Sequence, residues 1–322
     1  MKISVIGSSG ITESFIRASR SVAGADVIYC CSRTESRARE FAEKYGLQPR
    51  WNYDELLRSG DIDTVYVASP NVCHYSQALE ALRAGVNVIC EKPLTVTPDQ
   101  ARSLFDVAED NGAFLFEAMK SVYSLGRPII ERELSKLGEI RSAHLDFSQR
   151  SSRYDALMRG EIPNIFRPEL CAGGLMDLGV YPIYVSVMLF GKPDKVLSHC
   201  DFIRTGADIA GSMIFVYPEL TVTITYSKAA AGHTGSRILG SDGAIVIKSI
   251  SKLTGITRYE NDGSCTELLP PDSDDDAMAA EIERIEQYYQ APDAVFYNET
   301  KSFSMSAAEI MEEIRRQNGF LF

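Results

Sequence analysis

The chain opens with Met1-Lys2-Ile3-Ser4-Val5-Ile6-Gly7-Ser8-Ser9-Gly10-Ile11-Thr12. The apolar run over residues 2–6 predicts a buried strand, and the two glycines after it predict a tight turn. Beyond the turn, apolar residues recur at helical spacing through residue 22. A strand, a glycine turn and a helix in this order are typical of the first half of a parallel βαβ unit.

The same alternation continues to about residue 117. Further strands are predicted at 27–31, 64–68, 86–90 and 114–116, with helices at 34–45 and 74–84 between them. Another helix is predicted to open at Thr97-Pro98-Asp99-Gln100, which combines a capping threonine, a proline at the first helical position and a glutamine three residues after the cap. The pattern predicts an α/β fold, with a doubly wound parallel sheet of the Rossmann type in a dinucleotide-binding domain over residues 1–120.

The pattern changes in the rest of the chain. Long alternating strands are predicted at 140–149 and across 196–226, and Ser241-Asp242-Gly243 is typical of a hairpin turn before a strand at 244–247. Helices are predicted at 129–137, 180–189, 277–290 and 306–316. Residues 121–322 are therefore expected to form an α+β domain that binds substrate and carries a large, open-faced, mostly antiparallel sheet. A sheet face without covering helices needs a partner, so we expect a homodimer or a higher homo-oligomer through it.

Composition excludes several classes of protein. The 322 residues are 45% hydrophobic, carry a net charge of −11 and show no basic stripe, so nucleic acid is not an expected partner. No stretch approaches the roughly 18 apolar residues of a membrane span, and no secretory signal is recognised. Seven cysteines without metal-like spacing predict reduced thiols in a cytoplasm and no metal site. The acid run Asp272, Asp274, Asp275 and Asp276 is interpreted as complementing the dipole of the helix that follows.

The first turn is a candidate phosphate site. Gly7 suits the tight turn, Ser9 stands where dinucleotide-binding turns place a second glycine, and Thr12 stands where they place a third. Backbone amides at a helix N-terminus attract phosphate, so Ser8 and Ile11 are included among the predicted cofactor contacts. The motif alone fits a purely structural turn about equally well; its position between a strand and a helix favours the nucleotide.

The end of the second strand predicts which nucleotide binds. NAD sites usually place an acidic residue there to bind the ribose hydroxyls, and this chain instead has Cys31-Ser32-Arg33. Ser32 and Arg33 suit a 2′-phosphate, because a guanidinium pairs with phosphate through two parallel bonds. NADP(H) is therefore favoured and NAD(H) remains possible. The alternative for Arg33 is a solvated side chain at a helix start.

Two further segments carry candidate reacting groups. Cys90-Glu91-Lys92-Pro93 ends a predicted buried strand, and ligands bind outside the carboxyl ends of such strands. In Gly173-Gly174-Leu175-Met176-Asp177-Leu178-Gly179-Val180-Tyr181, the acid and the tyrosine are four residues apart and share one helix face. Taken singly, each has a simpler interpretation: a loop lysine, an acid near a helix start and a core tyrosine.

Taken together, these motifs resemble the glucose–fructose oxidoreductase/inositol 2-dehydrogenase/rhizopine-catabolism (Gfo/Idh/MocA) family over essentially the whole chain. Tyr181 is similar to the dihydrodiol dehydrogenase branch, where many other members have histidine. The resemblance implies a nicotinamide oxidoreductase acting on a secondary alcohol or carbonyl of a sugar, cyclitol or vicinal diol. The cofactor contacts predicted with it are Ser69, Pro70, Asn71, His74, Glu91, Lys92 and Glu117. A packing role for His74 is nearly as well supported.

The resemblance also implies roles for the reacting groups. It places Lys92 between nicotinamide and substrate and gives Asp177 the positioning of substrate. A free tyrosine, with a pKa of about 10, is a poor base at neutral pH, and a neighbouring ammonium favours its phenolate. We therefore expect Tyr181 to pass the proton with help from Lys92. Two alternatives stay open, namely a non-catalytic cofactor-sensing regulator on the same fold and a glycosidase that uses bound NAD transiently.

Overall fold

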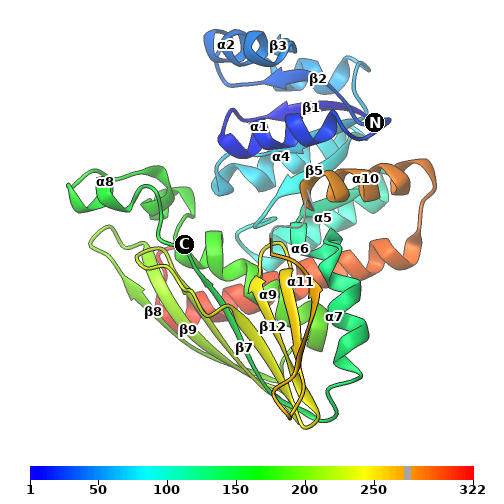
Figure 1. The fold of residues 1–322 in the computed structure, drawn as a ribbon. Coiled ribbons are helices and arrows are strands. Elements are labelled where there is room, and N and C mark those ends of the chain that lie inside the picture. Colours follow the sequence, from blue (N-terminus) through cyan, green and yellow to red (C-terminus); the bar gives the residue numbers. More distant parts are fainter. Residues whose placement is uncertain (272–276) are drawn as a thin grey trace. The chain divides into compact units, whose positions relative to one another are not determined.

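The computed structural model describes residues 1–271 and 277–322, so the acid run at 272–276 lies outside the described residues. The chain forms two compact units (Figure 1). The first unit contains Met1–Met119 and Met278–Met305, and the second contains Lys120–Ala277 and Ser306–Phe322. The change at 119/120 lies one residue from the predicted boundary. The return of 278–305 to the first unit differs from the prediction, which assigned all of 121–322 to the second domain.

The first unit is built on a six-stranded parallel sheet in the order β3-β2-β1-β4-β5-β6. The strands are β1 (Lys2–Ile6), β2 (Asp26–Cys31), β3 (Gln48–Arg50), β4 (Thr64–Val67), β5 (Asn87–Glu91) and β6 (Leu115–Ala118). Its helices are α1 (Gly10–Ser19), α2 (Glu35–Tyr45), α3 (Tyr53–Arg58), α4 (Asn71–Arg83), α5 (Pro98–Asp110), α10 (Ala277–Gln290) and the first half of α11 (Ala294–Asn318). The strand order reverses between β1 and β4, which confirms the predicted doubly wound topology.

Local sequence signals set the ends of several of these helices. The Thr97 side chain accepts the Gln100 amide, and the Gln100 side chain accepts the Thr97 amide, so the predicted capping box at the start of α5 is confirmed. Helix α2 ends at Gly46, whose left-handed φ of 71° is a conformation that glycine adopts without steric cost. Strand β3 and helix α3 have weak sequence patterns and are absent from the prediction.

The second unit carries an eight-stranded sheet in the order β14-β13-β12-β11-β7-β10-β9-β8. The strands are β7 (Ile140–Ser148), β8 (Lys195–Phe202), β9 (Asp208–Val216), β10 (Thr221–Ser227), β11 (Ser236–Gly240), β12 (Gly243–Ser249), β13 (Thr254–Tyr259) and β14 (Cys265–Leu269). Helical segments are α6 (Lys120–Tyr123), α7 (Gly126–Leu134), α8 (Tyr154–Met158), two short 3₁₀ turns η1 (Asn164–Phe166) and η2 (Pro168–Leu170), a π-helical turn η3 (Leu175–Gly179) and α9 (Val180–Phe190). Neighbouring strands are antiparallel except β7 and β10, which run parallel.

The two faces of this sheet differ. Along β10, Val222, Ile224 and Tyr226 are buried, and α9 packs against β7 and β10. The alternate residues form the other face, where Leu197 and Ile214 pair across β8 and β9 and remain exposed. The predicted open-faced sheet is thus confirmed. The segment Pro168–Phe190 is long and apolar enough to cross a membrane, but its most apolar window is 78% buried within the protein, so it is a core helix.

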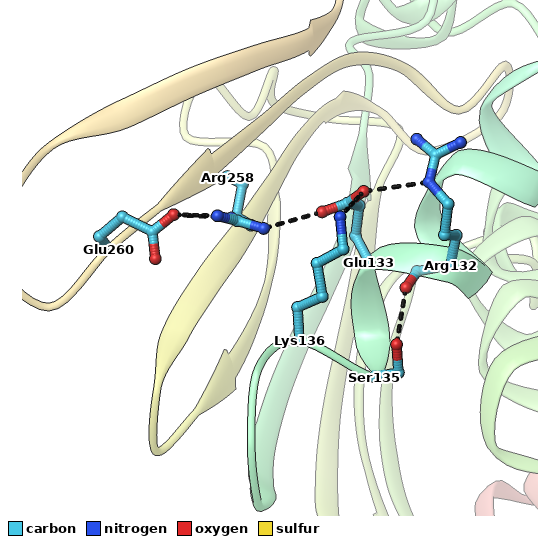
Figure 2. A network of polar contacts seen from close by, with 6 residues as sticks. All are labelled: Arg132, Glu133, Ser135, Lys136, Arg258 and Glu260. Carbon is cyan, nitrogen blue, oxygen red and sulfur yellow. Dashed lines mark hydrogen bonds and ion pairs between the residues drawn. The ribbon is translucent and has the colours of Figure 1, made fainter.

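A buried carboxylate attaches α7 to this sheet (Figure 2). The Glu133 side chain is 1% exposed and accepts from Lys136 at 2.8 Å, from Arg132 at 3.1 Å and from Arg258 on β13 at 3.1 Å. Arg258 also pairs with Glu260. Three cations therefore compensate one buried charge.

Candidate active site

The turn after β1 has the shape that a phosphate site needs. Gly7 has a φ of +112°, and a Cβ there would lie 2.5 Å from the Ala68 carbonyl oxygen. Glycine is thus required both by its backbone conformation and by the close approach of the loop after β4. Helix α1 starts three residues later, so its first backbone amides face the turn with the positive end of the helix dipole.

The serines of this turn are open to solvent, and the hydroxyl of Ser9 has a neighbour on the helix that follows. Ser8 and Ser9 are exposed, and the Ser9 hydroxyl lies 3.3 Å from the hydroxyl of buried Thr12. Ser9 occupies the cap position of α1, although its side chain makes no capping hydrogen bond among the described residues. Ile11 is half-buried on the first turn of α1.

The end of β2 presents the residues predicted for a 2′-phosphate. Arg33 is exposed, and Ser32 is half-buried with its amide donating to the Arg50 carbonyl at 3.1 Å. Their contact with a nucleotide stays a prediction.

The turn that carries Lys92 is held from two sides. Its neighbour Pro93 has its carbonyl oxygen 2.9 Å from His74 Nδ1, and the amide of Leu94 donates to the Glu117 carboxylate at 2.8 Å. His74 and Glu117 are both buried, so these two predicted cofactor contacts position the turn in the structure. Lys92 itself is half-buried after β5.

His74 also joins this turn to the loop after β4. Its Nε2 lies 2.9 Å from the Ser69 carbonyl oxygen, and the Ser69 hydroxyl donates to Gln77 at 2.7 Å. Burial lowers the pKa of His74, while its two carbonyl neighbours oppose that shift. Pro70 caps α4 and Asn71 begins it, three residues before the predicted start at His74.

Glu91, the residue before Lys92, has a buried partner of its own. The Tyr66 hydroxyl donates to Glu91 at 2.5 Å, and the Tyr66 ring stacks on Phe15 with centroids 3.7 Å apart. Burial raises the pKa of Tyr66 well above its ordinary value, so the phenol stays protonated and donates. Glu91 is therefore directed into the core beneath Lys92 rather than into solvent.

In the second unit, Asp177 and Tyr181 come from the predicted helix, but the helix begins differently. Asp177 lies in the π-helical turn η3, and Tyr181 lies in the first turn of α9. Both are half-buried, and the Tyr181 ring packs edge-on to Phe147 with centroids 5.2 Å apart. Single π turns inside helices occur frequently at functional sites.

The Gly-Gly motif before η3 is explained by a buried pair on the sheet. Asp208 accepts the Leu175 amide at 2.6 Å and the Tyr226 hydroxyl at 2.6 Å. A Cβ at Gly173 would collide with the Asp208 carboxylate, and one at Gly174 would lie 2.7 Å from the Tyr226 ring. Burial raises the pKa of Asp208 to about 6, against the opposing effect of these hydrogen bonds.

Sequence reasoning missed Lys228. Its side chain is 3% exposed, follows β10 directly, and forms an ion pair and hydrogen bond with Asp177. A signal was present, because Lys228 continues the two-residue period of buried Val222, Ile224 and Tyr226. Without the pairing partner, that pattern does not distinguish a buried lysine from the first residue of a loop.

The structure therefore brings together Asp177 and Lys228 in the second unit, and Glu91, Lys92, His74 and Glu117 in the first. No cluster of histidine, cysteine or acidic side chains suited to a metal occurs within residues 1–271 and 277–322. That Lys92 and Tyr181 act on one nicotinamide ring stays a prediction.

Comparison with known proteins decides the family. Residues 1–119 match the oxidoreductase family with an NAD-binding Rossmann fold, and residues 133–246 match the GFO/IDH/MocA C-terminal domain. The scyllo-inositol 2-dehydrogenase (NADP(+)) IolU of Bacillus subtilis is 32% identical over all of this chain and 98% of its own length. The chain belongs to the Gfo/Idh/MocA family of oxidoreductases. The predicted family is thus confirmed.

Two further comparisons show how far the likeness extends. The trans-1,2-dihydrobenzene-1,2-diol dehydrogenase of Mus musculus is 28% identical, over 76% of this chain and 72% of its own length. KijD10, a 3-ketoreductase from Actinomadura kijaniata solved with TDP-benzene and NADP, superimposes with a TM-score of 0.84 at 24% identity, covering 99% of this chain and 98% of that one. The latter likeness establishes the shared fold.

The family's fold implies a nicotinamide dinucleotide, and the residues present fit one. Gly7 leaves the turn without a side chain at the point of closest approach, and α1 presents its N-terminus there. No acidic residue follows β2 at Ser32 or Arg33 to compete with a 2′-phosphate.

Proposed function

We propose that this chain is an NADP(H)-dependent enzyme that interconverts a secondary alcohol and a carbonyl on a sugar, cyclitol or vicinal diol. The observation that carries this proposal is the end-to-end relationship with an enzyme named scyllo-inositol 2-dehydrogenase (NADP(+)), which spans 100% of this chain. Both units of the chain are therefore matched.

The cofactor is assigned to the first unit. Backbone amides around Ser8, Ser9 and Ile11 would hold the pyrophosphate, and Ser32 and Arg33 would hold the 2′-phosphate. The loop with Ser69, Pro70 and Asn71 and the turn with Lys92 complete the proposed contacts. Once bound, NADP(H) supplies or accepts the hydride. His74 and Glu117 support this arrangement by fixing the turn on which Lys92 lies.

The protein's chemical task is to move one proton and stabilise charge on one oxygen. In reduction, Tyr181 donates its proton to the substrate carbonyl oxygen; in oxidation, its phenolate removes the hydroxyl proton. The Lys92 ammonium favours the phenolate and donates a hydrogen bond to the same oxygen. Asp177 accepts a substrate hydroxyl and thereby orients the reacting carbon.

A substrate panel tests this function. Sugars, cyclitols and vicinal diols would each be incubated with enzyme and NADP⁺, and the corresponding ketones with NADPH, while NADPH absorbance is followed. We expect turnover with at least one polyol, and its loss in Lys92→Met. Tight NADP⁺ binding with no turnover across the panel would favour the regulator. Exchange of hydride into NADP⁺ without net oxidation would favour the glycosidase.

We further propose that two copies associate through the open sheet face in the cytoplasm. Leu197, Ile214, Leu239 and Tyr259 are exposed large apolar side chains on four strands of that sheet. None of the seven cysteines forms a disulfide within the described residues, which agrees with a reducing compartment. Light scattering should give a dimer that Ile214→Lys dissociates. Val295→Lys, at an exposed position on α11, should leave the dimer intact. A wild-type monomer at all concentrations would contradict this proposal.

A further inference from the structure

A buried lysine in the second unit, Lys228, forms an ion pair with the side chain of Asp177. The Lys228 side chain is 3% exposed, although an ammonium loses strong hydration on burial. Its amide donates to the Ile209 carbonyl at 2.8 Å, and its carbonyl accepts the Ser151 amide at 2.8 Å. The backbone at Lys228 is therefore fixed on both sides, and its ammonium is directed at Asp177.

The Lys228–Asp177 pair is buried at one end and open at the other. The Asp177 side chain is 42% exposed, so the carboxylate is the end that a substrate can reach. A buried ion pair adds little to the free energy of unfolding, because apolar residues of similar size often stabilise a core as well or better. Its placement at the residue proposed to orient substrate therefore points to a role in function rather than in stability.

The π turn that carries Asp177 is held at a second point by the same strand. Tyr226 lies on β10 and Lys228 directly follows that strand, and both side chains are buried two residues apart along the chain. Tyr226 acts through Asp208 on the backbone at Leu175, and Lys228 acts on the side chain of Asp177. One fixes where the turn lies, and the other fixes where its carboxylate points.

We propose that Lys228 is a positioning residue for the reaction, which keeps the Asp177 carboxylate ionised and oriented toward the substrate. This inference rests on the proposed function. Lys228 itself is too buried to contact substrate, so it acts only through Asp177. Loss of its charge should let Asp177 take up a proton more readily and rotate, which weakens its acceptor role. Misplacement of an orienting group by about 1 Å can cost on the order of 100-fold in rate.

The test compares variants of the pair in steady-state kinetics with NADP(H) and the best substrate from the panel. Lys228→Met should lower kcat/KM by about 10- to 100-fold and move the acidic limb of its pH profile to higher pH, with the Kd for NADPH unchanged. Lys228→Arg should restore most of the activity. Lys192→Met, which removes an exposed pair with Glu309, is the matched control and should leave kcat/KM and the profile unchanged.

The double variant Asp177→Asn/Lys228→Met keeps the inference testable if Lys228→Met alone does not fold, because it leaves no unpaired buried charge. Its kcat/KM should equal that of Asp177→Asn. A further tenfold loss, or a folded Lys228→Met with wild-type kcat/KM and pH profile, would overturn the role of Lys228. Wild-type enzyme that turns over no substrate of the panel would instead overturn the proposed function, on which this inference rests.

Discussion

Tyr226 donates its hydroxyl to the same Asp208 oxygen that accepts the Leu175 amide, and both hydrogen bonds measure 2.6 Å. Asp208 is fully buried, and its other carboxylate oxygen has no hydrogen-bond partner among the described residues. A charged carboxylate is costly there, which agrees with the raised pKa of about 6. The start of the helix that carries Asp177 is therefore fixed by a group that is easier to bury when protonated.

This pair predicts an unusual pH dependence of stability. Because the folded pKa of Asp208 exceeds its ordinary value of 3.8, its stabilising contribution is fully present below that value and lost as pH rises through about 6. Relative to Asp208→Asn, the wild-type free energy of unfolding should increase by about 1 kcal/mol from about pH 7 to about pH 5. Urea denaturation of both proteins measures this difference. A difference that does not change with pH would contradict the assignment.

The phosphate turn predicts unequal effects of two glycine substitutions. Gly7→Ala places a Cβ 2.5 Å from the Ala68 carbonyl oxygen at a positive φ, so we expect a loss of about 1–3 kcal/mol in unfolding free energy. Gly10→Ala is the matched control, because its Cβ would have nothing within 4 Å and lies at a helix start. Thermal unfolding should rank Gly7→Ala below wild type and Gly10→Ala near it. Equal effects would show that the turn tolerates side chains at residue 7.

The exposed Arg33 after β2 is expected to set the preference for NADPH over NADH. Removing its guanidinium in Arg33→Ala should raise KM for NADPH by about 10- to 100-fold, the loss of one or two charge-assisted hydrogen bonds, and leave KM for NADH nearly unchanged. Arg58→Ala, which removes an exposed side chain of α3, controls for the change in net charge. Equal losses with both cofactors, or none with NADPH, would remove Arg33 from the 2′-phosphate site.

The Glu133 network predicts a contribution to stability of the second unit. Its hydrogen bond from Lys136 is the main cause of the lowered pKa of Glu133, so the contribution of Glu133 is present above its unfolded pKa and lost as pH falls through the folded one. At neutral pH, Glu133→Gln should cost about 1–3 kcal/mol in unfolding free energy, because three donors lose their charged acceptor. Glu131→Gln, which removes an exposed carboxylate paired with Arg127, should cost less, about 0.5 kcal/mol. Equal effects in urea denaturation would contradict this prediction.

The sequence signals that predicted the fold are local ones. The capping box at Thr97 and the hairpin at Ser241–Asp242 each fix a boundary through neighbouring residues, and each is found in the structure. Helix α10 matches its predicted bounds of 277–290. By contrast, the return of 278–305 to the first unit depends on contacts between distant segments, which periodicity does not encode.

The same distinction applies to the site. Lys92, Asp177 and Tyr181 are recognisable because they stand in motifs with a fixed spacing. Lys228 lies 51 residues from Asp177, and nothing in either local pattern links them. A packing role for His74 is among the sequence-based interpretations, but its hydrogen bond to the Pro93 carbonyl is not encoded in any local pattern. The same holds for Glu117, which acts through the backbone amide of Leu94.

The most direct test of the proposed reaction is the single-turnover rate of NADPH oxidation by Tyr181→Phe, measured with a ketone that the wild-type enzyme reduces. Removal of the proton donor should slow this step by about 10²- to 10⁴-fold while the Kd for NADPH stays within about twofold of wild type. A Tyr181→Phe enzyme that oxidises bound NADPH at the wild-type rate would show that another group supplies the proton.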